Sequence, residues 1–360
     1  MDNSLSTVVI PALEPHANLI EYVKVLCASG FNTVIVDDGS GPAYKDIFSA
    51  LSHLEGCVVL RHETNLGKGT ALKTAYRYLL DTEADVHFVI TADSDGQHTR
   101  EDVARLAQAL QEDPDGVILG NRDFSLSQVP FKSRAGNRIT SFVFALLFGA
   151  RCPDTQTGLR AFSRTLLPFM AEVAGERFEY EMNVLIALTR AGIRIRHIPI
   201  RTLYEDGNAG THFQTVRDSV RIYKTIFASF FAFLSSSLIA TGMDMAIYYI
   251  LFDVLETAGW NPAWQRIALA KTVARVSSAS FNFLVNKRFV FKLKSGGVRA
   301  AVRYAALCVM VLLMSVGAVS LLNRALSINE RILSPIVDLI LFFINYRVQA
   351  GWVFKKEERT

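Results

Sequence analysis

The sequence predicts an α/β domain with a mostly parallel, helix-covered sheet, followed by an all-α domain of four transmembrane helices. Two observations lead to this fold class. Up to about residue 215, short β-branched runs alternate with helical patterns, as in βαβ units. Beyond that point charge becomes sparse: Asp244 is the only charged residue in 227–252, and residues 304–322 contain none. A helix needs about 20 mainly apolar residues to cross a bilayer core, so these stretches exclude a wholly soluble protein.

Composition and charge narrow the functional classes. Half of the 360 residues are apolar and only 20% are charged, which is unusual for a soluble enzyme. The net charge of +4 is dispersed, so no nucleic-acid partner is expected. Four widely spaced cysteines without CxxC spacing argue against a zinc site or a disulfide framework and fit a reducing compartment. The polar start of the chain lacks the basic and apolar regions of a signal peptide, so we expect the first domain in the cytoplasm.

The α/β domain is predicted from its elements in order. Helical patterns near 16–28, 42–53, 68–82 and 100–112 separate strand-like runs at 8–10, 33–36, 58–60, 88–90 and 117–119. Ligands bind beyond the carboxyl ends of the strands in such sheets. Two acidic turns fall at these ends, Asp37-Asp38 after the second strand and Asp93-Ser94-Asp95 after the fourth. The positions favour a chemical role for both turns.

The apolar half contains four candidate spans, at 227–252, 267–286, 303–322 and 332–350. The second is the weakest because Lys271 and Arg275 lie inside it. Basic residues gather before the first span, between the second and third, and after the fourth, so the positive-inside rule places both termini and the α/β domain in the cytoplasm. We therefore expect a catalytic domain at 1–215, a juxtamembrane amphipathic helix at 216–226 and a membrane domain at 227–360.

Charged residues inside the spans should be paired or functional. For Asp244, Lys271, Arg275 and Asp338, ion pairing between helices is the leading interpretation, and a phosphate-binding track through the two cations is the alternative. The apolar half also contains a repeat, because Asn282-Phe283 and the FVFK at 289–292 return 63 residues later as Asn345-Tyr346 and WVFK. Either the copies are two interfacial anchors, or they mark a duplicated two-helix unit.

The DSDGQH sequence at 93–98 is the strongest short chemical signal. Two carboxylates one residue apart at a strand end can hold a hard divalent cation and leave positions open for phosphates. The alternative is an ordinary turn, since Asp and Gly favour turns. Lys68 lies in NLGKG, which is not a Walker loop because Gly69 follows the lysine. It opens a predicted helix whose first amides, with Lys68, could face a phosphate.

The motifs combine into a family resemblance. Pro11 with Glu14, DDGS at 37–40, NLGKG at 65–69 and DSDGQH at 93–98 resemble, in order and spacing, the family 2 glycosyltransferases of GT-A fold. GNR at 120–122, SRAGN at 133–137 and DTQTGLR at 154–160 resemble the dolichyl-phosphate mannose synthase and polyprenyl-phosphate glucosyltransferase branch, over about residues 7–215. The apolar half is similar to GtrA-like four-helix domains.

The resemblance implies site roles on both substrates. On the donor, a UDP- or GDP-linked sugar, it implies contacts from Pro11, Glu14, Asp37, Asp38, Lys68 and Asp93. It implies Mg²⁺ or Mn²⁺ on the diphosphate, held by Asp93, Asp95 and Gln97, to neutralise the charge of the leaving group. Acceptor phosphate would meet Arg122, Ser133 and Arg134, since guanidinium groups bind phosphate oxygens in pairs.

Asp95, Arg122 and Asp154 are the expected catalytic residues, and the role of Asp154 is open. A phosphate monoester, with a second pKa near 6, is already anionic at neutral pH, so no strong base is needed. Asp154 could position the sugar, position the arginines, or accept a residual proton. The mixed basic and apolar stretch at 131–149 suits a helix in the lipid headgroup region, with a buried core helix as the alternative.

Together these features predict an inverting glycosyltransferase that moves a sugar from a nucleoside diphosphate to polyprenyl (dolichyl or undecaprenyl) phosphate at the cytoplasmic membrane face. The partners would be the two substrates and the lipid bilayer, with a homo-oligomer left open. Two alternatives stand beside it. One is a translocator of lipid-linked sugars whose first domain loads the cargo. The other is a glycan synthase acting on a hydroxyl, disfavoured because the sequence has no QxxRW motif.

Overall fold

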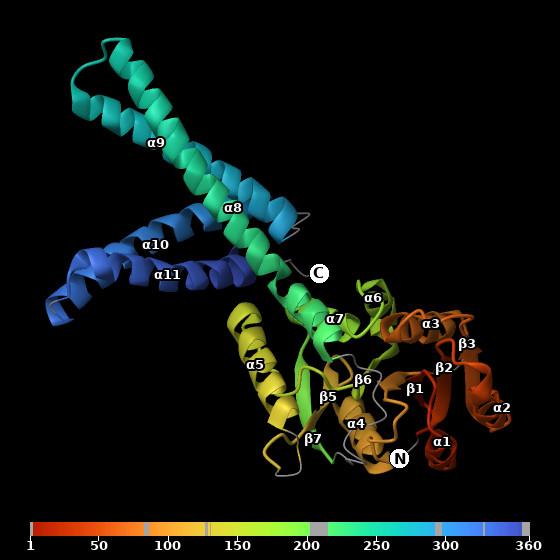
Figure 1. Ribbon diagram of the computed structural model, residues 1–360. Coiled ribbons are helices and arrows are strands. Elements are labelled where there is room, and N and C mark those ends of the chain that lie inside the picture. Colours follow the sequence, from red (N-terminus) through yellow and green to blue (C-terminus); the bar gives the residue numbers. More distant parts are fainter. Residues whose placement is uncertain are drawn as a thin grey trace. The chain divides into compact units, whose positions relative to one another are not determined.

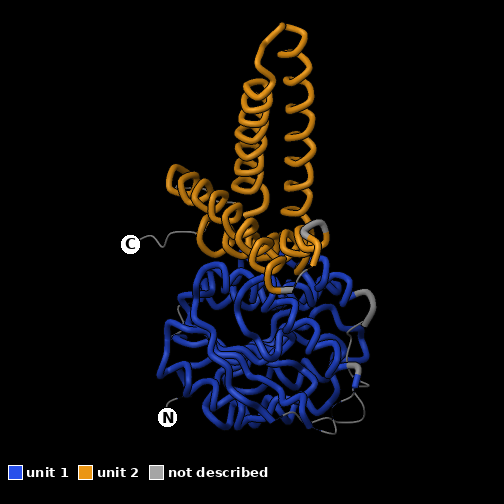
Figure 2. Tube along the Cα trace, turned by 90° about the vertical axis from the view of Figure 1, so that its left-hand side faces the viewer, with its two compact units in different colours: residues 1–225 blue, residues 226–360 orange. Residues whose placement is uncertain are grey.

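The computed structural model describes residues 3–82, 86–126, 129, 131–201, 215–291, 297–326 and 328–354. The chain divides into two compact units, Met1–Thr225 and Ile226–Thr360 (Figure 2). The first holds all the strands in the described ranges, and the second is helical (Figure 1). The predicted fold class, an α/β domain followed by a helical membrane domain, is confirmed.

Seven strands in the described part of unit 1 form one mixed sheet in the order β3-β2-β1-β4-β6-β5-β7. They are β1 (Ser6–Ala12), β2 (Asn32–Asp37), β3 (Cys57–Arg61), β4 (Phe88–Thr91), β5 (Val117–Arg122), β6 (Arg160–Ser163) and β7 (Ile195–Ile200). All neighbours are parallel except β6, which runs antiparallel to β4 and β5. The five predicted strands are present, and β6 and β7 are additional.

Helices cover both faces of this sheet, which explains why its strands read as continuous apolar runs: every residue of β1 is buried. On one face, apolar side chains of α1 (Asn18–Ala28), α2 (Lys45–Ser52) and α4 (Arg100–Glu112) pack into a single core with the strands. The other face contacts α3 (Lys68–Asp81), which also contacts α6 (Leu167–Glu172) and α7 (Glu179–Ala191). Helix α5 (Phe131–Phe148) contacts α7.

The carboxyl ends of β1, β2, β4 and β5 lie along one edge of the sheet, called here the carboxyl edge. Strands β2 and β4 are both parallel to β1, and β5 has the same direction as β4 because β6 runs antiparallel to both. Strand β6 starts at this edge, so the segment before it, including Asp154, is delivered to the same place. The last residues of these four strands and the loops that follow them, together with this segment, carry most of the predicted site residues. Topology therefore gathers residues that are far apart in the sequence.

Four long helices contain most of the described residues of unit 2: α8 (Thr215–Thr257), which begins before the unit, α9 (Ala263–Val285), α10 (Gly297–Leu326) and α11 (Glu330–Val348) (Figure 1). Among the described residues, three stretches are long and apolar enough to cross a membrane: Asp218–Thr257, Gly297–Ala325 and Ile332–Val353. The expected span at 267–286 lies in α9, which is helical but less apolar because it carries Arg266, Lys271 and Arg275. The predicted 216–226 helix is the start of α8, which continues unbroken into the first span.

Buried and half-buried polar side chains join the helices of unit 2 in a polar node, formed by Ser236, Asn282, Asn286, Tyr304, Asn345 and Gln349. At its centre, Asn286 is fully buried, accepts from Ser236 Oγ at 2.6 Å, and donates to Asn282 Oδ1 at 2.7 Å and Gln349 Oε1 at 3.1 Å. Hydrogen bonds between helices satisfy amides that would otherwise face an apolar surrounding. These hydrogen bonds of the polar node therefore hold the helices of unit 2 together.

The sequence repeat has a structural counterpart at the node. A turn of π-helix follows α9 at Asn286–Val290, and another follows α11 at Gln349–Val353. The central Asn286–Gln349 hydrogen bond joins residues 63 positions apart, which is the period of the repeat. Equivalent sequences thus adopt the same uncommon backbone, as a duplicated two-helix unit predicts.

Charged residues in these helices are only partly ion-paired. Arg275 contacts Asp244 at 3.4 Å, as expected. Asp338 instead accepts hydrogen bonds from Ser315 at 2.7 Å and Ser334 at 3.4 Å. Lys271 lies over the Tyr248 ring, 5.9 Å from its centroid. Ion pairing thus describes the first pair, whereas hydroxyl and aromatic groups solvate the other two charges.

Candidate active site

The DSDGQH loop after β4 places Asp93 at the centre of an ion cluster. Lys68 Nζ lies 2.6 Å from Asp93 Oδ1 and 2.9 Å from Glu181 Oε1. His98 Nε2 lies 3.3 Å from the other Asp93 oxygen, Oδ2. These four residues, Lys68, Asp93, His98 and Glu181, come from α3, the loop after β4 and α7. The structure therefore brings the predicted Lys68 and Asp93 together and adds two partners.

Glycines permit the close approach of these segments. A Cβ on Gly67 or Gly69 would overlap Glu176 or Tyr180, so both positions around Lys68 must lack a side chain. Gly67 also has a φ of 98°, a conformation that favours glycine. The amide of Thr70 donates to the Glu176 carbonyl at 3.0 Å, which fixes the start of α3 against the turn before α7. The glycines of the NLGKG motif thus allow the start of α3, with Lys68, to pack closely against the turn before α7.

Gly158, in the DTQTGLR segment, abuts the carboxylate of Asp93. A Cβ there would overlap all three atoms of the carboxylate group. Thr91 Oγ1 donates to the Gly158 carbonyl at 2.7 Å, which holds the segment against the end of β4. Two motifs about 60 residues apart in the sequence are therefore in direct contact at the carboxyl edge.

The electrostatics distinguish the two carboxylates of the loop. Burial acts to raise the pKa of Asp93, but the Lys68 ammonium and His98 outweigh it and hold that pKa well below its usual range. Burial, together with the negative charge of Asp93, raises the pKa of Asp95. Burial acts to lower the pKa of Lys68, yet Asp93 and Glu181 raise it overall. Asp93 and Lys68 are thus a stable ion pair, and Asp95 is the carboxylate in excess.

The donor set fits a divalent cation at Asp95. Asp95 Oδ1 accepts the Gln97 amide at 3.0 Å, whereas both oxygens of Asp93 already have cationic or imidazole partners. A carboxylate whose pKa is raised by a like charge gains from a nearby cation. Within the described part of the chain, no group of three or more His, Cys, Asp or Glu residues forms a metal cage. Any ion here would therefore need oxygen atoms from a ligand or water.

Arg122 and Asp154 form a second charged pair at the carboxyl edge. Arg122 Nε and one terminal nitrogen donate to the two Asp154 oxygens at 2.7 and 2.9 Å, a bidentate geometry. Asp154 is fully buried and also accepts the Gln156 amide at 3.1 Å. The Arg122 guanidinium lies over the Phe124 ring at 5.1 Å and its side chain keeps 23% exposure. Of the three roles left open, the geometry matches positioning of an arginine.

Ser133 and Arg134 lie in the first turn of α5. Ser133 is exposed. Arg134 donates to the carbonyl oxygens of Leu126 at 2.9 Å and Val129 at 3.5 Å, so its guanidinium supports the loop between β5 and α5. Its Nε is buried without a hydrogen-bond partner among the described residues. The acceptor-phosphate role of these two residues stays a prediction.

Both carboxylates after β2 are buried and make internal contacts. Asp38 accepts the amides of Leu66 at 3.0 Å and Gly67 at 2.8 Å and lies 2.8 Å from His62 Nδ1. It therefore anchors the loop that carries Lys68. Asp37 Oδ1 accepts the Ser40 amide at 2.8 Å, and its other oxygen lies 3.4 Å from the exposed Arg61. The donor contacts expected of these residues stay predictions.

Pro11 and Glu14 belong to the same end of the sheet. Pro11 is buried inside β1, next to Val36 of β2. Glu14 is exposed, has a φ of 46°, and its amide donates to Ser40 Oγ at 2.8 Å. This hydrogen bond ties the loop after β1 to the loop after β2. The donor contacts expected of Pro11 and Glu14 stay predictions.

Sequence reasoning missed Glu181 and assigned no separate role to His98. Glu181 lies near the start of α7, in a stretch that carries no motif, and its partner Lys68 is over a hundred positions earlier in the chain. The only signal in the sequence was an acidic residue beside apolar residues. Tyr22 of α1 was also missed: its hydroxyl is buried without a partner among the described residues. Burial, then Asp93, Asp95 and Asp102, raise the pKa of Tyr22.

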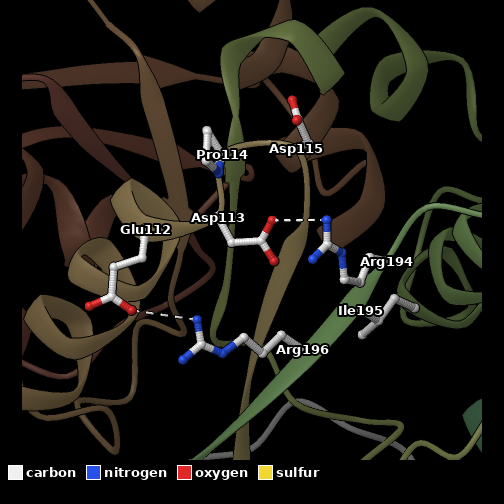
Figure 3. Close-up of a pocket in the computed structure, with 7 residues that line it drawn as sticks. All are labelled: Glu112, Asp113, Pro114, Asp115, Arg194, Ile195 and Arg196. Carbon is white, nitrogen blue, oxygen red and sulfur yellow. Dashed lines mark ion pairs between the residues drawn. The ribbon is translucent and has the colours of Figure 1, made fainter.

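An open depression of about 760 Å³ lies at the opposite edge of the sheet, where β5 and β7 begin. Its lining carries two ion pairs, Arg194 with Asp113 at 3.5 Å and Arg196 with Glu112 at 3.6 Å (Figure 3). Both arginines of the lining are paired internally, and none of the predicted site residues line the depression. We therefore place the site at the carboxyl edge.

Comparisons with known proteins match both units. Residues 7–168 match the family described as glycosyl transferase family 2, and residues 230–354 match the GtrA/DPMS transmembrane domain. An uncharacterised protein of Methanocaldococcus jannaschii is 31% identical over 204 residues, which cover 55% of this chain and 82% of the relative. These matches lie on the two parts that the sequence analysis separated.

Two further relatives have named activities. The UDP-N-acetylglucosamine–dolichyl-phosphate N-acetylglucosaminyltransferase of Methanococcus voltae is 29% identical over 224 residues, 57% of this chain and 88% of the relative. The undecaprenyl-phosphate 4-deoxy-4-formamido-L-arabinose transferase of Pseudomonas paraeruginosa is 24% identical over 276 residues, 72% of this chain and 76% of the relative. Both relatives are named as sugar transferases that use a polyprenyl phosphate.

Proposed function

Because the chain belongs to glycosyl transferase family 2 and carries a GtrA/DPMS transmembrane domain, we propose that it transfers a sugar from a nucleoside diphosphate sugar to polyprenyl phosphate. It is a multi-pass membrane protein whose first unit has a GT-A-like α/β fold. One observation supports the proposal most strongly: an acidic pair and an arginine–carboxylate pair lie at the same edge of the sheet. The acidic pair Asp93 and Asp95 suits a metal-bound diphosphate, and the Arg122–Asp154 pair suits a second phosphate.

The donor would occupy the loops after β1, β2 and β4. Glu14, Asp37 and Asp38 surround the end of β2, where we assign the nucleoside, with Pro11 shaping the backbone. Lys68 and Asp93 lie at the end of β4, where we assign the diphosphate. The 2.6 Å ion pair between them keeps the Lys68 ammonium at the place that we assign to the diphosphate. The UDP-sugar of the Methanococcus voltae relative makes a UDP-linked donor the first to test.

A divalent cation, Mg²⁺ or Mn²⁺, is part of this proposal. Asp95 would hold it, with Asp93 and Gln97 beside it, because Asp95 carries an unneutralised charge in a partly buried loop. When bound, such an ion neutralises the charge that develops on the departing diphosphate. The chain itself supplies the rest of the leaving-group environment through the Lys68 ammonium, which the structure places beside Asp93.

The acceptor phosphate would bind at Arg122. Its guanidinium is permanently charged and keeps 23% exposure at the carboxyl edge, and guanidinium groups bind phosphate oxygens in pairs. Asp154 fixes the plane of the guanidinium. A carboxylate held in this way is not needed as a base, because the acceptor phosphate is already anionic. Ser133 and Arg134 are assigned to the same phosphate on the motif they share.

The reaction follows from these assignments. A phosphate oxygen of the acceptor attacks the anomeric carbon of the sugar and forms the new C–O bond. The bond from that carbon to the diphosphate oxygen breaks, and its electrons leave with the nucleoside diphosphate. A single in-line displacement inverts the anomeric configuration, which we propose for this chain as the resemblance implies. Bringing both substrates together at one edge supplies proximity, a large part of the catalytic effect.

The lipid acceptor agrees with the surface of α5. Phe131, Ile139 and Phe142 expose 80%, 55% and 67% of their surface, while Phe144 is fully buried. An apolar stripe beside basic residues is typical of a helix at a membrane interface. We propose that residues 1–215 form the catalytic domain, that both termini are cytoplasmic, and that α9 adds a fourth span at residues 267–286.

The test compares the protein with Asp95→Asn. Purified enzyme is incubated with Mg²⁺ or Mn²⁺, polyprenyl phosphate and a radiolabelled UDP- or GDP-sugar, and label extracted into organic solvent is counted. We expect metal-dependent transfer that Asp95→Asn abolishes without unfolding the protein. Asp115→Asn is the matched control, because the exposed Asp115 lines the depression at the opposite edge. Full transfer by Asp95→Asn would contradict the assignment of the metal site.

A further inference from the structure

Glu181 belongs to the ion cluster through its contact with Lys68, whereas Lys68 and His98 both contact Asp93. Its carboxylate lies 2.9 Å from Lys68 Nζ, and its side chain is 10% exposed. Lys68, 16% exposed, lies between Glu181 and Asp93. A buried carboxylate costs free energy unless it is paired, so the contact with Lys68 accounts for its tolerance at this position.

The backbone around Glu181 is held firmly in place. Arg160 donates to the Glu181 carbonyl at 2.9 Å, and the Tyr180 hydroxyl donates to the Met170 carbonyl at 2.8 Å. Tyr180 also packs against Gly69, next to Lys68. The Phe178 ring lies 5.8 Å from Lys68 Nζ on the same turn. These hydrogen bonds and contacts therefore fix the start of α7 next to Lys68.

Among the residues that the structure describes, carboxylates accept from two of the three donors of the Lys68 ammonium. A lysine ammonium has three N–H donors. Asp93 and Glu181 are the acceptors of two, at 2.6 and 2.9 Å. A flexible four-carbon side chain would otherwise sample many rotamers, and a second carboxylate confines it. The two contacts come from different elements, so together they fix where the third N–H points.

We infer that Glu181 is a positioning residue that holds the Lys68 ammonium at the acidic loop, so that its third N–H meets a phosphate oxygen of the nucleoside diphosphate. This inference rests on the proposed function and deepens it. Asp93 and Asp95 alone would repel a diphosphate, and Lys68 offsets that repulsion only while it stays beside them. Glu181 thus acts on the donor through Lys68, not by contact.

The experiment is a double-mutant cycle on nucleotide binding by the full-length protein in detergent. Isothermal titration with UDP and Mg²⁺, and with GDP in parallel, is carried out on wild type, Glu181→Gln, Lys68→Met and the double variant. We expect Glu181→Gln to weaken binding of the preferred nucleotide about tenfold, as loss of a charge-assisted contact predicts. In the Lys68→Met background the same substitution should have no further effect, because the residue through which it acts is gone.

Glu179→Gln is the matched control. It removes the same charge two residues earlier in the chain, where Glu179 accepts the amides of Glu176 at 3.1 Å and Arg177 at 3.2 Å. It should bind nucleotide as wild type does. If Glu181→Gln does not give a native circular dichroism spectrum, Glu181→Asp, which keeps the charge and shortens the reach, replaces it in the cycle with the same expectation.

Two results would overturn the inference. One is nucleotide binding by the Glu181 variant that equals wild type. The other is an equal loss with and without Lys68, which would indicate a general effect on α7. Failure of the proposed function looks different: wild type would bind nucleotide, and the cycle would behave as expected, but no sugar would reach polyprenyl phosphate.

Discussion

Asp154→Asn should destabilise the carboxyl edge and disorient Arg122. Asp154 is fully buried, and its two oxygens accept the Arg122 guanidinium at 2.7 and 2.9 Å. Removing one partner of a buried ion pair costs about 3–5 kcal/mol. Arg122 keeps 23% exposure and can turn partly toward water, so we expect about 3 kcal/mol, the lower end of that range. That loss corresponds to roughly a 100-fold larger population of the opened state.

Cys152 provides the assay, two residues from the substitution. Its thiol lies 3.4 Å from the Asp154 carbonyl oxygen and is 3% exposed. Burial raises the pKa of Cys152 to about 12, so alkylation at pH 8 requires local opening. Iodoacetamide labelling followed by peptide mass spectrometry should show a roughly 100-fold faster modification of Cys152 in Asp154→Asn, provided that closing is faster than labelling.

The matched control is Asp115→Asn, which makes the same chemical change at the opposite edge of the sheet and should label at the wild-type rate. A labelling rate for Asp154→Asn as slow as that of this control would refute the reasoning, because it would mean that Arg122 does not depend on the buried carboxylate.

Three other outcomes are expected. Gly158→Ala should reduce transfer about 100-fold by displacing the Asp93 carboxylate, whereas Gly41→Ala, which meets open space, should not. Burial lowers the pKa of His197, so its contribution to stability is present above the unfolded pKa near 6.5 and is lost as pH falls below it. In urea unfolding followed by Cys152 labelling, His197→Asn should therefore lose less stability than wild type between pH 7.5 and 5.5. Asn286→Leu should cost about 2 kcal/mol, from three lost hydrogen bonds, in thermal unfolding followed by tryptophan fluorescence, because all three tryptophans lie in unit 2.

Much of the fold was predictable because its signals are local. Runs such as 8–10 and 33–36 are β-branched and bounded by turns, and the structure has β1 and β2 there. Strand β6 was missed because Arg160–Ser163 is four residues long and contains a buried arginine. Strand β7 was missed because Ile195–Ile200 carries Arg196 and Pro199 at its exposed positions and the half-buried His197 between them. Only pairing with a neighbouring strand makes these segments extended.

The site was predictable where one segment carries the chemistry. Asp93 and Asp95 fall in a single turn, and their location at the carboxyl edge follows from the strand pattern. Partnerships between segments were not predictable, since Lys68 with Glu181, and Gly158 with Asp93, depend on tertiary packing. Asp38 shows the same limit: its motif predicts a ligand contact, but its hydrogen bonds with the Leu66 and Gly67 amides could not be read from the sequence.

The most direct test of the central claim is the chemical identity of the product. Wild-type protein is incubated with polyprenyl phosphate, a divalent cation and the donor that it binds, and the lipid fraction is analysed by mass spectrometry. We predict polyprenyl phosphate that carries a single sugar on its phosphate, formed only with the metal present. Sugar transferred to a hydroxyl acceptor, or released by hydrolysis while the lipid stays unmodified, would contradict the account of Arg122 as the acceptor-phosphate site.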